Sequence, residues 1–120
     1  MLQMDIEGAE WPILEDITNL QLQKFQIFIL ELHNLENLMN RNLRDGVMEV
    51  LHKLSTTHFC SHFHVNNAGG FYFLKGRRFP RVVEVTLLNR NFFTPGSEKL
   101  ENLSLDCASD PAIYDWQFKF

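Results

Sequence analysis

Three carboxylates stand close together near the start of the chain, in the stretch MDIEGAEW at residues 4–11. Asp5, Glu7 and Glu10 surround Gly8, which permits a sharp turn of the backbone. Carboxylates grouped in this way can accept protons or hold a ligand by hydrogen bonds. They can also simply stabilise the start of a following helix. We favour this structural interpretation for Glu10 and a functional one for Asp5.

Two apolar stretches further along the chain, KFQIFILELH at 24–33 and HFCSHFHVNN at 58–67, also become polar toward their ends. The polar residues there are Glu31, His33, His64, Asn66 and Asn67. If these stretches are parallel strands of an open α/β sheet, their carboxyl ends meet at one edge, where ligands bind in such sheets. We therefore expect these side chains to gather with the carboxylates that follow the first strand.

Three kinds of chemistry fit this polar cluster. A carboxylate beside His33 or His64 would tune the imidazole for acid–base catalysis near neutral pH. Asp5 would alternatively position a cofactor or a substrate through hydrogen bonds. A metal-dependent hydrolase that uses Asp5, His33 and His64 is a further alternative. Since no spacing here is a known metal signature, we assign no metal ligand from the sequence.

The elements that must hold these residues follow the order strand, helix, strand, helix, strand, strand. Residues 2–6 and 24–33 predict strands, and the second is apolar on both faces, as in a sheet buried between helices. Pro12 is well placed in the first turn of a helix. Apolar residues recurring every four positions over 35–54 predict an amphipathic helix.

Two strands that pair antiparallel are expected in the second half of the chain. Alternation over 58–67 predicts one face with Phe59, Phe63 and Val65 and another with Cys60, His62, His64 and Asn66. The β-branched stretch 79–90, with Pro80 near its start, predicts the other strand. A long loop with Lys75, Arg77 and Arg78 is expected to join them, and we interpret it as a solvated loop. Residues 96–120 predict a polar tail that lies on the surface or is partly disordered.

These elements predict the C-terminal half of a larger α/β domain, with parallel strands ending in an antiparallel hairpin. The chain has 120 residues, 45% of them apolar, which suffices for one small domain. A net charge of −4 gives no indication of nucleic acid or an anionic membrane as partner. We expect neither a membrane-spanning segment nor a signal peptide. Cys60 and Cys107 are too few for a disulfide scaffold, and whether they pair is left open.

Several of these motifs, in this order, resemble the FkbM-type methyltransferases. LQMDIEGAEWPIL resembles the family's strand-and-turn motif, commonly (I/L)-K-x-D-x-E-G-x-E, and IFILELH resembles its next strand, which ends in E-x-H. HFHVNN followed by FPRVVEVTLL resembles the closing hairpin, and LDCASDP is similar to the polar tail of some animal members. The resemblance spans residues 2–111, and the first motif is its most specific part.

The resemblance implies a Rossmann-like class I methyltransferase fold with a seven-stranded sheet whose last strand runs antiparallel. Residues 1–95 would be a partial domain that supplies the fourth to seventh strands. The implied reaction is methyl transfer from S-adenosylmethionine to a hydroxyl oxygen of a small molecule or glycan. Asp5 and Glu7 would contact the cofactor, and Asp5 or His33 would assist deprotonation of the acceptor. The substrate-binding residues would be Glu31, His64 and Asn66.

One family element is absent from the sequence. No G-x-G-x-G occurs in the 120 residues, so the glycine-rich cofactor loop of the first strand and the ribose-binding acid of the second are not represented. The alternative to a methyltransferase is therefore a non-catalytic truncated or interaction domain. The metal-dependent hydrolase is the less favoured alternative.

Overall fold

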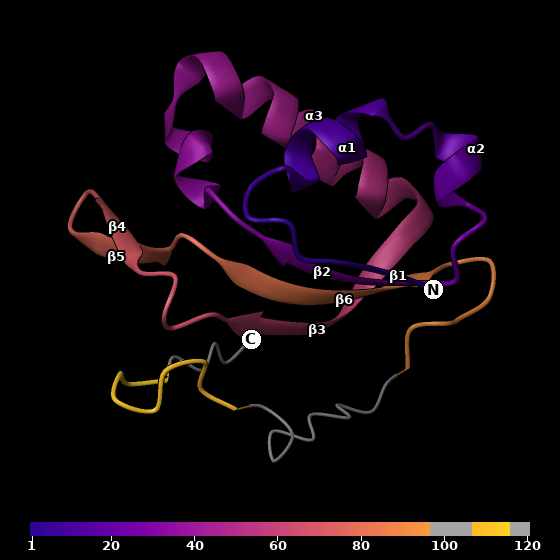
Figure 1. The fold of residues 1–120 in the computed structure, drawn as a ribbon. Coiled ribbons are helices and arrows are strands. Elements are labelled where there is room, and N and C mark those ends of the chain that lie inside the picture. The colour runs from indigo at the N-terminus through magenta and orange to yellow at the C-terminus, as the bar shows by residue number, and fades with distance from the viewer. Residues whose placement is uncertain (97–106, 116–120) are drawn as a thin grey trace.

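A computed structural model describes residues 1–96 and 107–115, and in the first of these ranges strands and helices alternate (Figure 1). The bounds are β1 (Leu2–Met4), α1 (Glu10–Asp16), α2 (Asn19–Leu22), β2 (Ile27–Leu32), η1 (Leu35–Met39), α3 (Arg41–Thr57), β3 (His58–Val65), β4 (Phe71–Leu74), β5 (Arg77–Pro80) and β6 (Val83–Asn89). The predicted succession of elements is present. The short helix α2 and the pair β4–β5 were not predicted.

The main sheet is mixed, with the strand order β1-β2-β6-β3. Strand β1 runs parallel to β2, whereas β6 runs antiparallel to both of its neighbours, β2 and β3. Strands β1, β2 and β3 therefore share one direction, and their carboxyl ends lie at the same edge of the sheet. The predicted antiparallel pairing of the last two strands is confirmed, and β6 lies between β2 and β3.

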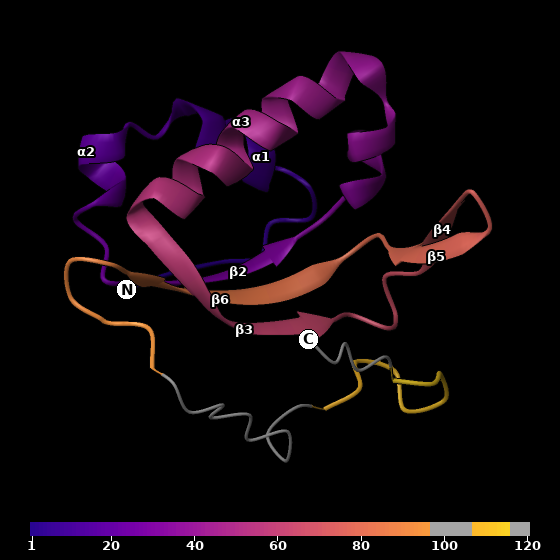
Figure 2. The same cartoon turned by 180° about the vertical axis from the view of Figure 1, so that it is seen from behind.

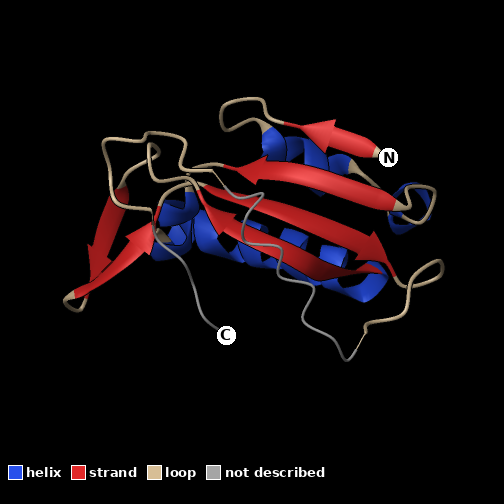
Figure 3. Ribbon diagram, turned by 90° about the horizontal axis from the view of Figure 1, so that it is seen from below, coloured by secondary structure: helices blue, strands red, loops and turns tan. Residues whose placement is uncertain are grey.

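The helices cover one face of this sheet, as Figures 1 and 2 show from opposite sides. The core between helices and sheet is formed by Met4, Trp11, Leu14, Leu22, Phe28, Leu30, Leu32, Val47, Val50, Leu54, Val65, Val83 and Val85. The prediction that the second strand is buried on both faces is wrong. Phe28 and Leu30 point into the core, but Ile29 points to the opposite face and is 36% exposed. Figure 3 shows this face without helices.

Local capping determines where the helices start. Thr18 caps the N-terminus of α2 in a capping box. Its side chain accepts a hydrogen bond from the backbone N–H of Gln21, and the side chain of Gln21 accepts one from the backbone N–H of Thr18. The helix predicted over 35–54 is divided, because Asn40 has an extended backbone conformation and caps α3 by accepting from the amide of Asn42. The preceding turns are the 3-10 helix η1, and α3 continues to Thr57.

The predicted alternation of faces along β3 is wrong at one point. A β-bulge lies between Cys60 and His62, so that Ser61 is an extra residue without a partner in the ladder. One extra residue moves the side chains before the bulge to the opposite face of the sheet. Phe59, which pairs with Leu88, therefore lies on the same face as His64, and Cys60 lies on the same face as Phe63.

The predicted long basic loop is instead a small two-stranded ribbon, β4–β5. Its turn is formed by Lys75 and Gly76, both with positive φ, and Arg77 and Arg78 lie within β5. The strand predicted over 79–90 accordingly begins only at Val83, since β5 extends to Pro80.

Part of the predicted tail, residues 107–115, is described by the structure and lies on the side of the sheet opposite the helices (yellow in Figure 1), where Asp115 contacts His64. The side chain of Asn67 holds this segment by donating to the carbonyls of Asp110 and Ile113, and it accepts from the amide of Asp110. The remainder of the predicted tail after residue 96 lies outside the described residues. Cys60 and Cys107 are both exposed and free.

Candidate functional site

The turn after β1 is organised by the buried carboxylate of Glu10. Glu10 is 0% exposed, and its Oε1 accepts hydrogen bonds from the amides of Ile6 at 3.0 Å and Gly8 at 3.2 Å. The same oxygen lies 3.0 Å from Nδ1 of His33. Glu10 therefore joins the turn after β1 to the residue that follows β2. Glu10 is thus structural, as interpreted from the sequence, but not as a helix cap: the Ile6 and Gly8 amides that it accepts from belong to the turn before α1, and it also orients His33.

Charge and burial oppose each other at this carboxylate. Burial by itself raises the pKa of Glu10, but backbone amides, among them those of Ile6 and Gly8, and the nearby His33 outweigh it. The net pKa lies below the ordinary glutamate value of 4.5. Glu10 is therefore a carboxylate at neutral pH, and it favours a proton on Nδ1 of His33.

His33 is also held through its backbone. The indole Nε1 of Trp11 donates to the carbonyl oxygen of His33 at 2.6 Å. With Nδ1 bonded to Glu10, the nitrogen left for chemistry is Nε2. Its nearest ion-pair partner is Oε2 of Glu7, at 3.6 Å, on a side chain that is 87% exposed. The imidazole is thus fixed on its inner side by Glu10, while Nε2 faces the exposed side chain of Glu7.

The turn itself requires a glycine at position 8. Gly8 has φ +101°, and a Cβ built there would clash with Nδ2 of Asn34. Asn34, directly after His33, has φ +56°, and Glu7 also has a positive φ. Asparagine and glycine occupy such conformations most readily. The close approach of these two turns brings Asp5 and His33 to the same corner of the sheet.

A row of titratable side chains crosses the sheet at the edge where β1, β2 and β3 end, on the face opposite the helices. In the ladder, Glu31 of β2 pairs with Glu84 of β6, and Glu84 pairs with His64 of β3. Asp5 follows Met4, whose partner is Leu30, so Asp5 stands beside Glu31. Glu84 is not among the site residues predicted from the sequence, and the strand register places it inside the row.

One end of this row brings three predicted site residues together. Asp5, Glu31 and His33 each offer a ligand atom, and these atoms all lie within 4.8 Å of one another. Asn66 donates from Nδ2 to Oε1 of Glu31 at 2.5 Å. Burial raises the pKa of Glu31, the neighbouring negative charge of Asp5 raises it further, and the Asn66 hydrogen bond partly opposes them. Beside these residues lies a cavity of about 250 Å³, which Glu84 also lines.

His64 lies at the other end of the row and not in this cluster. Its Nε2 is 3.2 Å from Oδ1 of Asp115, and its Nδ1 is 3.8 Å from Oε2 of Glu84. The structure thus unites Asp5, Glu31, His33 and Asn66, leaves Glu7 at their exposed margin, and gives His64 a separate pair of carboxylates. This placement does not favour the hydrolase with Asp5, His33 and His64 as one set.

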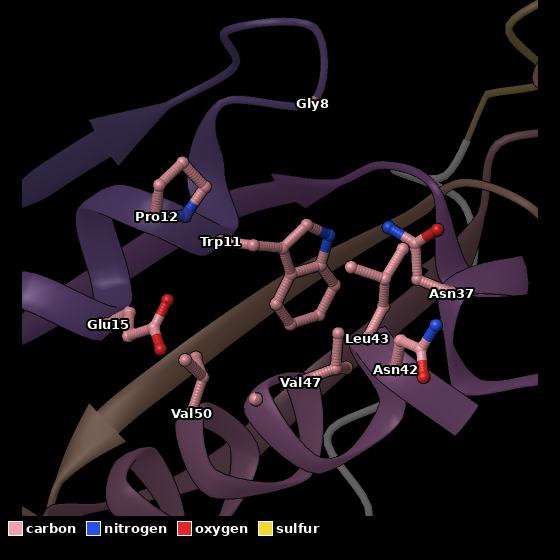
Figure 4. Close-up of a pocket in the computed structure, with 10 residues that line it drawn as sticks. Gly8, Trp11, Pro12, Glu15, Asn37, Asn42, Leu43, Val47 and Val50 are labelled. Atoms are coloured by element: carbon pink, nitrogen blue, oxygen red, sulfur yellow. The ribbon is translucent and has the colours of Figure 1, made fainter. Parts of the chain in front are cut away.

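A second cavity, of about 300 Å³, lies on the helical side of the sheet (Figure 4). It is lined by Gly8, Trp11, Pro12, Glu15, Asn37, Asn42, Leu43, Gly46, Val47 and Val50. Figure 4 shows the Trp11 indole facing Leu43 and Val47 of α3, with Asn37 and Asn42 at the margin. This cavity contains none of the clustered carboxylates or histidines, so the row on the opposite face is the better candidate for chemistry.

Comparison with protein-family models, with curated proteins and with solved structures gave no match for this chain. The resemblance to FkbM-type methyltransferases therefore rests on the motifs quoted above. In the described part of the chain, every helix is too short or too polar to cross a membrane, which agrees with the prediction of no membrane segment.

Proposed function

We propose that this chain is the C-terminal half of an S-adenosylmethionine-dependent methyltransferase of the FkbM type, acting on a hydroxyl oxygen. The observation that carries the proposal is the sheet order β1-β2-β6-β3 with β6 alone reversed. In the fold implied by the resemblance, β1, β2, β3 and β6 would be the fourth to seventh strands. The reversed last strand is the feature that this fold requires.

The position of the polar residues supports the same proposal. Asp5 and His33 follow two parallel strands at the edge where open α/β sheets bind ligands. The lining of the cavity beside Asp5 and Glu31 includes the carboxylates of these two residues and of Glu84, which suit a ligand that carries positive charge. S-adenosylmethionine has a positively charged sulfonium. When bound, it supplies an electrophilic methyl group.

The residues of this chain would bind and orient the reactants and move one proton. Asp5 and Glu7 would contact the cofactor, and Glu31 and Asn66 would hold the acceptor hydroxyl in line with the methyl group. His33 would accept the hydroxyl proton at Nε2, since Glu10 already occupies Nδ1. The imidazolium so formed would be stabilised by the carboxylate of Glu10.

Titration of S-adenosylmethionine into the purified chain tests this proposal. The titration is repeated with any coding sequence found upstream of Met1 included, because the glycine-rich loop is not among these 120 residues. Saturable binding that is weakened by Asp5→Asn, and unchanged by Asp45→Asn on α3, supports a methyltransferase. The absence of binding in both forms, while circular dichroism shows them folded, favours the non-catalytic domain.

A further inference from the structure

Three side chains of metal-ligand type converge where β1 and β2 end. Asp5, Glu31 and His33 come from separate positions in the chain, yet their ligand atoms all lie within 4.8 Å of one another. Carboxylate oxygens together with an imidazole nitrogen suit divalent first-row metals such as Mn²⁺, Fe²⁺ and Zn²⁺. We infer that these three residues bind one divalent cation, a site that the sequence spacing did not indicate.

The imidazole is prepared for this role by a wholly buried partner. Metal-binding histidines commonly donate their other ring N–H to a carboxylate, which fixes the ring and its tautomer. Glu10 occupies that position, because its Oε1 is 3.0 Å from Nδ1 of His33 and is anchored by two backbone amides. Nε2 is left as the nitrogen that binds the cation. The other oxygen of Glu10, Oε2, is buried and has no hydrogen-bond partner among the described residues.

The carboxylate ligands are also positioned. Asn66 donates to one oxygen of Glu31 and leaves the other available. Asp5 is exposed and stands beside Glu31 without an ion-pair partner among the described residues, so its oxygens are accessible from solvent. Each proposed ligand is therefore oriented by a neighbour or accessible from solvent.

The local charge is unbalanced without a cation. Around the site stand the carboxylates of Asp5, Glu7, Glu10, Glu31 and Glu84. Within residues 1–96 and 107–115, the ion pairs of these carboxylates go only to His33 and His64, and none to a lysine or arginine. A divalent cation between Asp5 and Glu31 would neutralise the two carboxylates that lie closest together. The cavity at this point gives it access and room for further oxygen ligands.

Cation binding goes beyond methyl transfer and does not depend on it. One consequence does rest on the proposed function: a bound cation would coordinate the acceptor hydroxyl and lower its pKa. His33 would then be a ligand, and the proton of the acidified hydroxyl would pass to solvent water instead of to the imidazole.

Electron paramagnetic resonance of Mn²⁺ tests the site directly, because binding removes the signal of the free ion. MnCl₂ is titrated into the full chain, without S-adenosylmethionine, and into Asp5→Asn, His33→Gln and the control Asp45→Asn. We expect one Mn²⁺ per chain, an affinity at least about tenfold lower in the first two variants, and unchanged binding in Asp45→Asn. Zn²⁺ should displace Mn²⁺, since it binds such ligands more tightly.

Two outcomes would overturn the inference. One is no stoichiometric binding at millimolar Mn²⁺ by folded protein. The other is binding that Asp5→Asn and His33→Gln leave unchanged, which would indicate scattered surface carboxylates. Asp5 is exposed, so Asp5→Asn keeps the test valid even if His33→Gln fails to fold. Mn²⁺ binding without any cofactor binding would retain the cation site and reject the methyltransferase, whereas the reverse would reject only the cation site.

Discussion

Replacement of Glu10 measures how strongly one buried carboxylate holds the site together. Glu10→Ala removes the acceptor of the Ile6 and Gly8 amides and the partner of His33 Nδ1. Each unpaired group costs about 1–3 kcal/mol, partly offset because a buried charge is removed as well. We expect the free energy of unfolding to fall by about 3–5 kcal/mol, the range for breaking a buried ion pair. That is a large part of the roughly 6–18 kcal/mol typical of 120 residues.

Glu10→Gln keeps the shape and an oxygen acceptor but removes the charge. Its cost should be about 1–2 kcal/mol, the difference between charged and neutral hydrogen bonds. The pH dependence has a defined sign. Because the pKa of Glu10 is lower in the folded than in the unfolded chain, its ionised form stabilises the fold above the ordinary value of 4.5. This stabilisation is lost as the pH falls through the folded pKa, so the wild type and Glu10→Gln should converge in acid.

Urea denaturation followed by circular dichroism and tryptophan fluorescence gives these free energies. Glu15→Ala, on the same helix and exposed, is the matched control and should change stability little. The reasoning would be refuted if the free energy of unfolding of Glu10→Ala lay within about 0.5 kcal/mol of that of the wild type. It would also be refuted if the Glu10→Gln difference stayed constant between neutral and acid pH.

Three further perturbations test other parts of the structure. Gly8→Ala should lower the free energy of unfolding by about 1–3 kcal/mol, because the alanine would be strained and would clash with Asn34. The loss should exceed that of Gly76→Ala, where φ is also positive but nothing lies within 4 Å of the added Cβ. Equal urea midpoints of the two variants would contradict this expectation. Burial lowers the pKa of His58, so the unfolded chain binds the proton more readily, and the free energy of unfolding should fall as pH decreases below 6.5. His58→Phe should reduce this dependence of the free energy of unfolding on pH. The same dependence in the variant and the wild type would show that His58 is not its source. Asn67→Ala removes the hydrogen bonds that hold residues 110–113, so proteolysis there should accelerate while the far-ultraviolet spectrum stays constant; an unchanged cleavage rate would show that other contacts hold the segment.

The strands and the main cluster were predictable from the sequence because both follow from short-range patterns. An apolar run that ends in Glu31 and His33 shows where β2 ends, and parallel strands bring such ends to one edge. The association of Asp5 with Glu31 and His33 follows from that rule. The ribbon β4–β5 was missed although FYFL and RRFP flank Lys75 and Gly76, a turn signal that could have been recognised.

Other features depend on contacts that no local pattern contains. The bond between Glu10 and His33 joins residues 23 positions apart, so the sequence could indicate a buried acid but not its partner. The bulge at Ser61 has no distinctive residue type, yet it exchanges the faces of all residues before it. The exposure of Ile29 followed from having helices on one face only, which depends on the whole sheet and not on the strand.

Glu84 shows why a rule for parallel sheets was incomplete here. That rule directs attention to residues at the carboxyl ends of strands, and Glu31 and His64 satisfy it. Strand β6 runs in the opposite direction, so its beginning lies at the edge where the parallel strands end, and Glu84 is the second residue of β6. An acid at the start of an antiparallel strand inserted between parallel ones therefore belongs to the same row. Glu84→Gln should accordingly weaken Mn²⁺ binding less than Asp5→Asn does, because it changes the charge beside the site without removing a ligand.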